Sequence, residues 1–168
     1  GNIFRQQGKD AEAITAYQKA IAINPQLGVA YKHLGNLLAK QGKDNEAITA
    51  YQKAIQLNPN EGIVYVNLGN LLAKQGKDTE AITAYQKALQ LNPNEGIVYV
   101  SLGDLLAKQG KDAEAINAYQ KAIQLNPNEG IVYVNLGDLL AKQGKDAEAI
   151  NAYQKAIKLN PNEGIVYV

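Results

Sequence analysis

Tyrosine recurs in this chain at an interval of 34 residues, as between Tyr31 and Tyr65, and this period constrains the fold more than any other feature. All ten tyrosines occupy two phases of the period, and all five prolines share one. A period of this length is typical of arrays in which each repeat packs on its neighbours. The two tyrosine series are Tyr17, Tyr51, Tyr85, Tyr119 and Tyr153, and Tyr31, Tyr65, Tyr99, Tyr133 and Tyr167.

The period predicts a single array over residues 1–168. We number the positions of each full repeat from its first glycine, which is Gly28, Gly62, Gly96 or Gly130. The predicted parts are a truncated repeat over 1–27, full repeats over 28–61, 62–95, 96–129 and 130–163, and the start of a further repeat over 164–168.

Within a repeat, hydrophobic residues recur mostly at spacings of three and four, which indicates helices. In the repeat 62–95, Gly76 stands where a glycine is expected just beyond a helix C-terminus. Asp78 fits the N-cap of a second helix, and Pro93 cannot continue that helix. Each repeat is therefore predicted to hold two helices, a tight turn between them and a proline-containing turn after them. The apolar positions are Ile63, Val64, Leu68, Leu71 and Leu72, then Ala81, Ile82, Tyr85, Ala88, Leu89 and Leu91.

One set of spaced residues resembles the tetratricopeptide repeat: Tyr65, Leu68, Gly69, Leu72, Ala81, Tyr85, Ala88 and Pro93. The resemblance covers all 168 residues and recurs in every repeat. It implies an all-α fold, an α-solenoid of tandem antiparallel helix pairs in a right-handed superhelix, whose first helices line a concave groove. A glycine inside a helix costs about 1 kcal/mol relative to alanine, so we expect Gly69 to allow a close approach between helices.

Composition excludes most catalytic and metal chemistry. The chain has no cysteine and one histidine, His33, which excludes disulfides, zinc–thiolate sites and a multi-histidine metal site within one chain. Its carboxylates recur in phase at the predicted helix N-termini, so they are interpreted as caps and helix-dipole partners. Near-identical repeats offer no pair of carboxyl groups with different environments. We therefore predict no enzyme activity, no catalytic residue, no metal and no cofactor.

Charge excludes two further classes of partner. Lys plus Arg number 17 and Asp plus Glu number 16, so a net charge of +1 offers no footprint for nucleic acid. No apolar run approaches the roughly 20 residues that cross a membrane. The absence of a signal or membrane segment slightly favours the cytoplasm, but the chain starts at Gly1 without Met, so the compartment cannot be read from these residues.

The resemblance implies that positions two, five, six, nine, twelve and thirteen of each repeat face the groove. Ile and Val at positions two and five form an apolar stripe, which is either a binding surface or packing between successive first helices. Packing accounts more easily for position two than for position five. The predicted groove residues are Asn2, Lys32, His33, Asn36, Ile63, Val66, Asn67, Asn70, Ile97, Val100, Ser101, Asp104, Ile131, Val134, Asn135 and Asp138.

The asparagines among these residues suggest two modes of peptide binding. Their amides both donate and accept, so a row of them can bind an extended backbone. This row is similar to the asparagine ladder of the glycosyltransferase that modifies proteins with N-acetylglucosamine. The carboxylate clamp for heat-shock chaperone tails is matched only by Lys32, Asn36 and Asn67, because Ile97 and Ser101 replace its last two basic residues.

Two functions remain open at this point. The first is a non-catalytic module that binds an extended peptide or a partner helix of another protein in the groove. The second is a structural spacer or self-assembling scaffold, natural or engineered, that stacks head to tail. Gly1 occupies position eight and Val168 position five of a repeat, so the ends of two chains are nearly complementary and we predict end-to-end association at high concentration.

Overall fold

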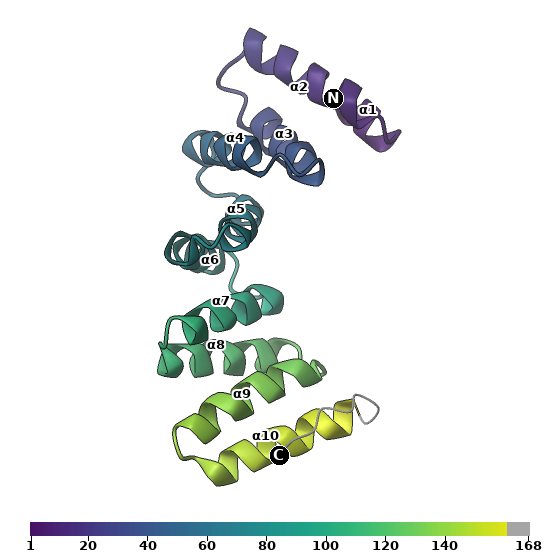
Figure 1. The fold of residues 1–168 in the computed structure, drawn as a ribbon. Helices are drawn as coiled ribbons and strands as arrows, with labels where there is room; N and C mark the ends of the chain where they lie inside the picture. The colour runs from purple at the N-terminus through teal and green to yellow at the C-terminus, as the bar shows by residue number, and fades with distance from the viewer. Residues whose placement is uncertain (161–168) are drawn as a thin grey trace. The chain divides into compact units, whose positions relative to one another are not determined.

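The structure, a computed structural model, describes residues 1–160, which form ten α-helices and no strand (Figure 1). The chain divides into two compact units, Gly1–Leu91 and a second unit that begins at Asn92. The N-terminal unit contains α1 (Asn2–Gln6), α2 (Asp10–Ile23), α3 (Gly28–Lys40), α4 (Asp44–Leu57), α5 (Gly62–Lys74) and α6 (Asp78–Leu91). The C-terminal unit contains α7 (Gly96–Lys108), α8 (Asp112–Leu125), α9 (Gly130–Lys142) and α10 (Asp146–Leu159).

Each unit is built from antiparallel helix pairs, as the sequence predicts. In the N-terminal unit α3 packs on α4 and α5 on α6, while α2 and α4 also contact the first helix of the next repeat. In the C-terminal unit α7 packs on α8, α8 contacts α9, and α9 packs on α10. The predicted all-α solenoid of helix pairs is confirmed.

The tight turn within each repeat follows from its glycine. Gly76 has φ of +74°, which a residue with a side chain rarely adopts. Its backbone N–H donates to the Ala73 carbonyl at 2.9 Å, and the Lys77 N–H donates to the Leu72 carbonyl at 2.9 Å. These two bonds satisfy carbonyls at the end of α5 in a Schellman motif, so the predicted helix stop is confirmed.

The aspartates that follow this turn do not cap the second helix, which corrects the sequence prediction. Helix α6 already begins at Asp78. In the equivalent α4, Lys43 is the N-cap residue, and no side chain caps the helix. Asp44 instead occupies the first helical position, where its charge still opposes the positive end of the helix dipole. Spacing alone predicted the helix start one residue too late.

The proline-containing turn is bridged by polar side chains. The residue before each proline leaves helical geometry, as at Asn126, with φ of −138° and ψ of 94°. Its amide then reaches across the turn, because Asn126 Nδ2 donates to Glu129 Oε1 at 2.6 Å. Asn92 and Glu95 make the same bond at 2.6 Å.

The core depends on close contact between a glycine and a tyrosine. A Cβ on Gly69 would lie 2.6 Å from Cε1 of Tyr85, which is itself 2% exposed. Gly35 and Tyr51, and Gly103 and Tyr119, make equivalent contacts. The predicted close approach at the mid-helix glycine is confirmed, and Ala81 on the second helix of the same repeat is fully buried.

The repeat boundaries within residues 1–168 remain a prediction. Val168, on which predicted end stacking rests in part, lies outside the described residues. Gly1 does sit as its position predicts, because a Cβ there would collide with the ring of Tyr17.

Candidate functional site

Position two of the first helices carries the most exposed apolar side chains of the predicted groove. Ile63 on α5 is 57% exposed, and in the C-terminal unit Ile97 on α7 and Ile131 on α9 are 61% and 52% exposed. Position five is half-buried in all three helices, at Val66, Val100 and Val134. The sequence analysis expected packing to account for position two more easily than for position five. The structure shows the reverse, since position five is more buried than position two.

The reason lies in where neighbouring first helices meet. On α5, Asn67 reaches α3, because its Nδ2 donates to Asn36 Oδ1 at 3.1 Å. This contact lies one turn beyond Ile63 and does not cover it, although Val64 in the same turn is 1% exposed. We call the surface formed by positions two, five, six and nine the first-helix face, and treat its parts in the two units separately.

The position-nine side chains of the first-helix face are already engaged inside the protein. In the N-terminal unit the Tyr51 hydroxyl donates to Asn36 Oδ1 at 2.9 Å, and the Tyr85 hydroxyl donates to Asn70 Oδ1 at 2.8 Å. Asn2 accepts in the same way from Tyr17 at 2.5 Å. The carbonyl oxygens of these asparagines are therefore used, and a ligand would meet their Nδ2 donors.

In the C-terminal unit the same position is acidic. Tyr119 donates to Asp104 Oδ1 at 2.7 Å, and Tyr153 donates to Asp138 Oδ1 at 2.7 Å. Asn135 Nδ2 also donates to Asp104 Oδ1, at 3.2 Å. Burial, followed by the hydrogen bond to Asp104, raises the pKa of Tyr119. The Tyr119 hydroxyl therefore stays protonated. Asp104 and Asp138 each accept a hydrogen bond from a tyrosine, and their carboxylates could also interact with a ligand.

The remaining position-six residues depart from this asparagine pattern. Ser101 turns back onto its own helix, because its Oγ donates to the Ile97 carbonyl at 3.2 Å. His33 on α3 lies against the ring of Tyr17, with ring centroids 5.5 Å apart, and its Nδ1 is 3.1 Å from Arg5 Nη1. Burial first, and then the charges of Arg5 and Lys32, hold the pKa of His33 below its usual value of 6.5. A neutral His33 therefore accepts a hydrogen bond from Arg5.

Lys32, the one basic residue at position five, is paired within the protein. Its Nζ lies 2.5 Å from Glu61 Oε2 at the start of α5. The hydrogen bond from Lys32 is the largest cause that lowers the pKa of Glu61. Lys32 thus matches the carboxylate clamp in sequence, but its charge already has a partner.

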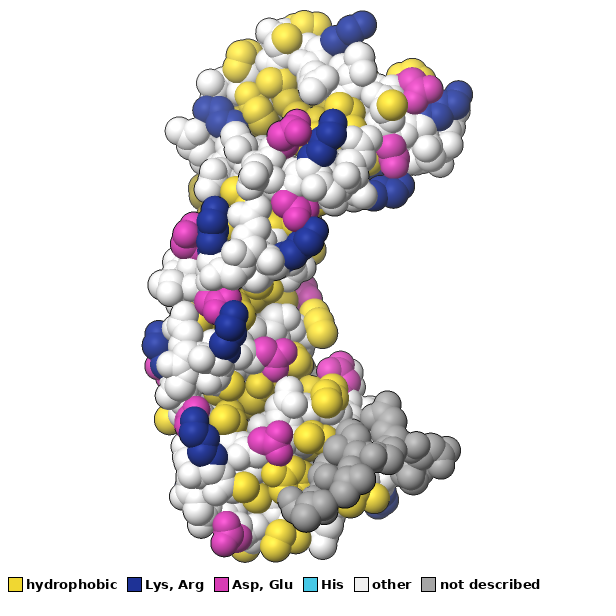
Figure 2. Space-filling view, viewed as in Figure 1, with side chains coloured by type: hydrophobic (Ala, Val, Ile, Leu, Met, Phe, Trp, Pro, Cys, Tyr) yellow, Lys and Arg dark blue, Asp and Glu magenta, His cyan; other side chains and the backbone are white. Residues whose placement is uncertain are grey.

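Lysines at the ends of the first helices join one repeat to the next. Lys40 pairs with Asp10 at 2.6 Å and Lys74 with Asp44 at 2.6 Å. In the C-terminal unit Lys142 pairs with Asp112 at 2.7 Å. Figure 2 shows basic and acidic side chains interspersed over the visible surface of both units, which agrees with the net charge of +1.

The described residues hold no assembled metal or membrane site. No group of three or more histidine, cysteine, aspartate or glutamate side chains within 1–160 is arranged to hold a metal ion. No helix among these residues is both long and apolar enough to cross a membrane.

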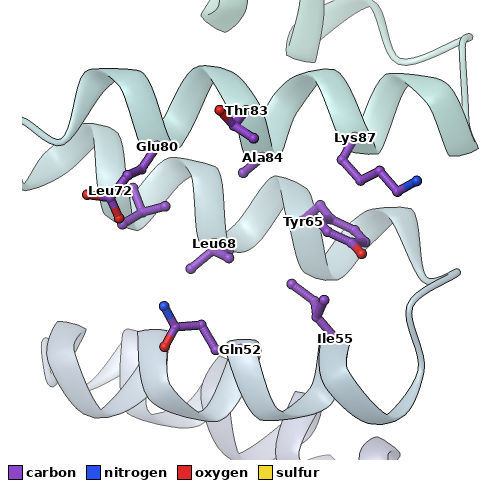
Figure 3. Close-up of a pocket in the computed structure, with 9 residues that line it drawn as sticks. All are labelled: Gln52, Ile55, Tyr65, Leu68, Leu72, Glu80, Thr83, Ala84 and Lys87. Carbon is purple, nitrogen blue, oxygen red and sulfur yellow. The ribbon is translucent and has the colours of Figure 1, made fainter.

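Sequence reasoning missed a cavity on the other side of the first helices. In the N-terminal unit a cavity of about 510 Å³ opens between α4 and α6, with α5 as its floor (Figure 3). We call it the α4–α6 furrow. The apolar signal was present, since its floor residues are repeat-signature positions. Leu68 and Leu72 are buried core residues, at 8% and 4% exposed, and they also line this cavity. The lining residues are Gln52, Ile55, Tyr65, Leu68, Leu72, Glu80, Thr83, Ala84 and Lys87.

Comparison with known proteins shows which family has this architecture. The family profile described as "TPR repeat" matches residues 1–42, 35–76, 69–110 and 103–144, and the one described as "Tetratricopeptide repeat" matches 131–163. No curated protein sequence matches the chain.

Several solved structures share the fold. A crystal structure of MamA is 28% identical with a TM-score of 0.87, and the match covers 96% of this chain and 94% of MamA. The structure of pilF from Pseudomonas aeruginosa is 26% identical with a TM-score of 0.74, over 93% of this chain and 71% of pilF. YrrB, described as a TPR protein with an unusual peptide-binding site, is 24% identical with a TM-score of 0.88, over 96% of this chain and 84% of its own. At that identity YrrB is informative about the fold alone. From the repeat profiles and these structures together, the chain belongs to the tetratricopeptide repeat family, a family of protein-interaction scaffolds.

Proposed function

We propose that the chain is a non-catalytic module that binds an extended peptide or a helix of a partner protein on its first-helix face. The observation that carries this proposal is the exposure of Ile63, Ile97 and Ile131, each more than half exposed at the same position. Single exposed apolar residues are common, so the support for a binding surface comes from their recurrence at one position in three repeats.

The polar residues beside these isoleucines suggest how a ligand would be oriented. In the N-terminal unit Asn36 and Asn70 present amide donors, because tyrosine hydroxyls occupy their carbonyl oxygens. These donors suit backbone carbonyls of an extended segment. In the C-terminal unit Asp104 and Asp138 suit backbone N–H groups or a basic side chain. We therefore expect the N-terminal unit to bind a segment with apolar anchors and accessible backbone carbonyls, and the C-terminal unit to prefer a segment with a basic rather than an acidic residue.

A peptide-display selection against the intact protein tests this proposal. A variant with Ile63→Glu, Ile97→Glu and Ile131→Glu runs in parallel, since these exposed side chains can change without filling or emptying the core. Circular dichroism verifies that its helicity is retained. A motif enriched on the intact protein but not on the variant supports the proposal. Equal enrichment on both proteins, or none on either, contradicts it.

Assembly is a second candidate, favoured by the open face of α10. Ile150 is 56% exposed, whereas Ile48 and Ile116 at the same position of α4 and α8 are each 7% exposed. Both of those helices contact the first helix that follows them. We expect α10 to accept a first helix from a second copy, which sedimentation velocity over a wide concentration range would detect. An Ile150→Glu variant that keeps the same concentration dependence as the native protein would contradict assembly through this face.

A further inference from the structure

We propose that the α4–α6 furrow is a second docking site, which takes an amphipathic helix of a partner protein that carries a basic and an acidic residue seven positions apart. This inference goes beyond the proposed function, since it concerns the opposite side of α5. Successive residues turn by about 100° around a helix, which places Leu68 and Leu72 away from Ile63.

The furrow has the size and lining of a docking site. Its volume of about 510 Å³ falls within the range of roughly 300–1,000 Å³ found for binding pockets. Leu68, Leu72 and Tyr65 form its floor from α5, and Ile55 stands on the α4 side (Figure 3). Because the walls are two helices rather than a closed ring of residues, the shape suits an elongated apolar face more than a compact small molecule.

The charges on the rim define the occupant further. Glu80 and Lys87 lie at opposite ends of the furrow on α6, both exposed (Figure 3). Neither forms an ion pair with another residue in the described part of the chain. Seven residues of helix span about 10 Å, so these charges match a partner helix with opposite charges one heptad apart. Apolar residues between those charges would face Leu68 and Leu72.

The equivalent site in the C-terminal unit shows what closes the furrow. There the cavity is about 200 Å³, lined by Tyr133, Leu136, Leu140, Asn151 and Lys155 among others. Lys155 lies over the Tyr133 ring, with Nζ 5.7 Å from its centroid. This cation–π contact fills the space that remains open in the N-terminal unit.

We attribute the change to two of the sequence differences between these repeats. In the open furrow Lys87 turns along its own helix, with Nζ 3.5 Å from Gln90 Oε1. Lys158 replaces that glutamine in α10, so Lys155 loses its acceptor and gains a like charge three residues away. Asn151 also replaces the smaller Thr83. The α4–α6 furrow is therefore open, whereas its equivalent between α8 and α10 is largely closed.

These two copies supply matched variants for the test. Thr83→Asn with Gln90→Lys should close the furrow, and Asn151→Thr with Lys158→Gln should open its C-terminal equivalent. Each exchange introduces residues that the same position already carries elsewhere in the chain, so helicity should persist. Because the chain has no cysteine, a single Gln56→Cys beside the furrow, or Gln124→Cys beside its equivalent, takes an environment-sensitive dye at one place.

The probe is a stapled helical peptide with leucines at spacings of three and four, flanked by one Lys and one Glu seven residues apart. Two control peptides carry Lys at both flanking positions or Glu at both. We expect the matched peptide to shift the emission of the dye attached at position 56 and to bind about tenfold more tightly than either control at low salt, with a smaller difference at high salt.

The variants decide where the peptide binds. The closing variant should abolish the shift, and the opening variant should create one for the dye attached at position 124. Ile63→Glu, on the first-helix face, should leave both results unchanged. Equal binding of all three peptides, no shift in the native furrow, or a shift that survives closure would overturn the proposal.

Discussion

At the scale of single residues, the fold is set by contacts that leave no room for substitution. The Tyr85 ring lies against Gly69, and its hydroxyl reaches Asn70 one residue further along α5. One tyrosine thus joins the two helices of a repeat and also fixes a residue of the first-helix face. In the neighbouring repeat, burial raises the pKa of Tyr51 to about 12, so its hydroxyl stays a donor to Asn36 at all ordinary pH values.

Gly69→Ala tests this packing. The new Cβ would lie 2.6 Å from the Tyr85 ring, so the ring must move out of its buried position. Overpacking a core costs about 1–3 kcal/mol. Replacing glycine by alanine inside a helix gains about 1 kcal/mol in helix propensity, so the net effect is destabilising unless the overpacking cost is at its minimum. We expect the free energy of unfolding, measured with urea, to fall by about 1 kcal/mol.

Gly96→Ala is the matched control. A Cβ there would lie 3.5 Å from Leu125 Cβ, an ordinary contact. This variant should be as stable as the native protein or slightly more so, and equal losses for both variants would refute the packing argument.

His33 makes stability depend on pH. Its pKa in the folded protein lies below the usual value of 6.5, chiefly because of burial. The folded state therefore resists protonation, and stability present above pH 6.5 is lost as the pH falls through the lower folded pKa. We expect the melting temperature to drop between about pH 7.5 and about pH 5.5. His33→Asn, which introduces the residue that the equivalent positions Asn67 and Asn135 carry, should reduce this fall in melting temperature. If the fall were unchanged, titration of other groups would be its cause.

At the scale of elements, the helices could be predicted from the repeated sequence. The exposure of the candidate site residues could not, because it depends on contacts between repeats. The spacing of Gly76 and Pro93 predicted where helices stop, because both residues act through their own backbone. The exposure of Ile63 could not be predicted, because it depends on where α3 and α5 meet. The furrow was missed for the same reason, since the spacing of Leu68 and Leu72 indicates an apolar face but not whether a neighbouring helix fills it.

The N-termini of the second helices offer a test at this scale. Lys43 is the N-cap residue of α4 and its side chain makes no capping bond. Lys43→Ser supplies an oxygen for a free backbone N–H, which typically stabilises a helix by about 1 kcal/mol. Urea unfolding should show this gain. Gln86→Ser, at an exposed position inside α6, should instead lower stability slightly, and a gain there would show that capping is not the cause.

At the scale of the whole molecule, the family indicates a protein-interaction scaffold but does not identify a ligand. The single histidine is engaged with Tyr17 and Arg5, and the carboxylates recur as dipole partners and ion pairs. Some of the differences between repeats lie at exposed positions. Asn70 becomes Asp104, and Gln90 becomes Lys158 two repeats later. Within an otherwise repetitive chain, such exchanges make the surface of one repeat differ from that of another.

Isoleucine-methyl NMR with a peptide from the display selection tests the central claim most directly. Methyl signals of Ile63, Ile97 and Ile131 report the first-helix face, and those of the buried Ile48, Ile82 and Ile116 report the core. Ile55 reports the α4–α6 furrow and Ile150 the open face of α10. We predict that the peptide perturbs the first three signals and leaves the core signals in place. Perturbation confined to Ile55 or Ile150, with the first-helix signals unchanged, would contradict binding on the first-helix face.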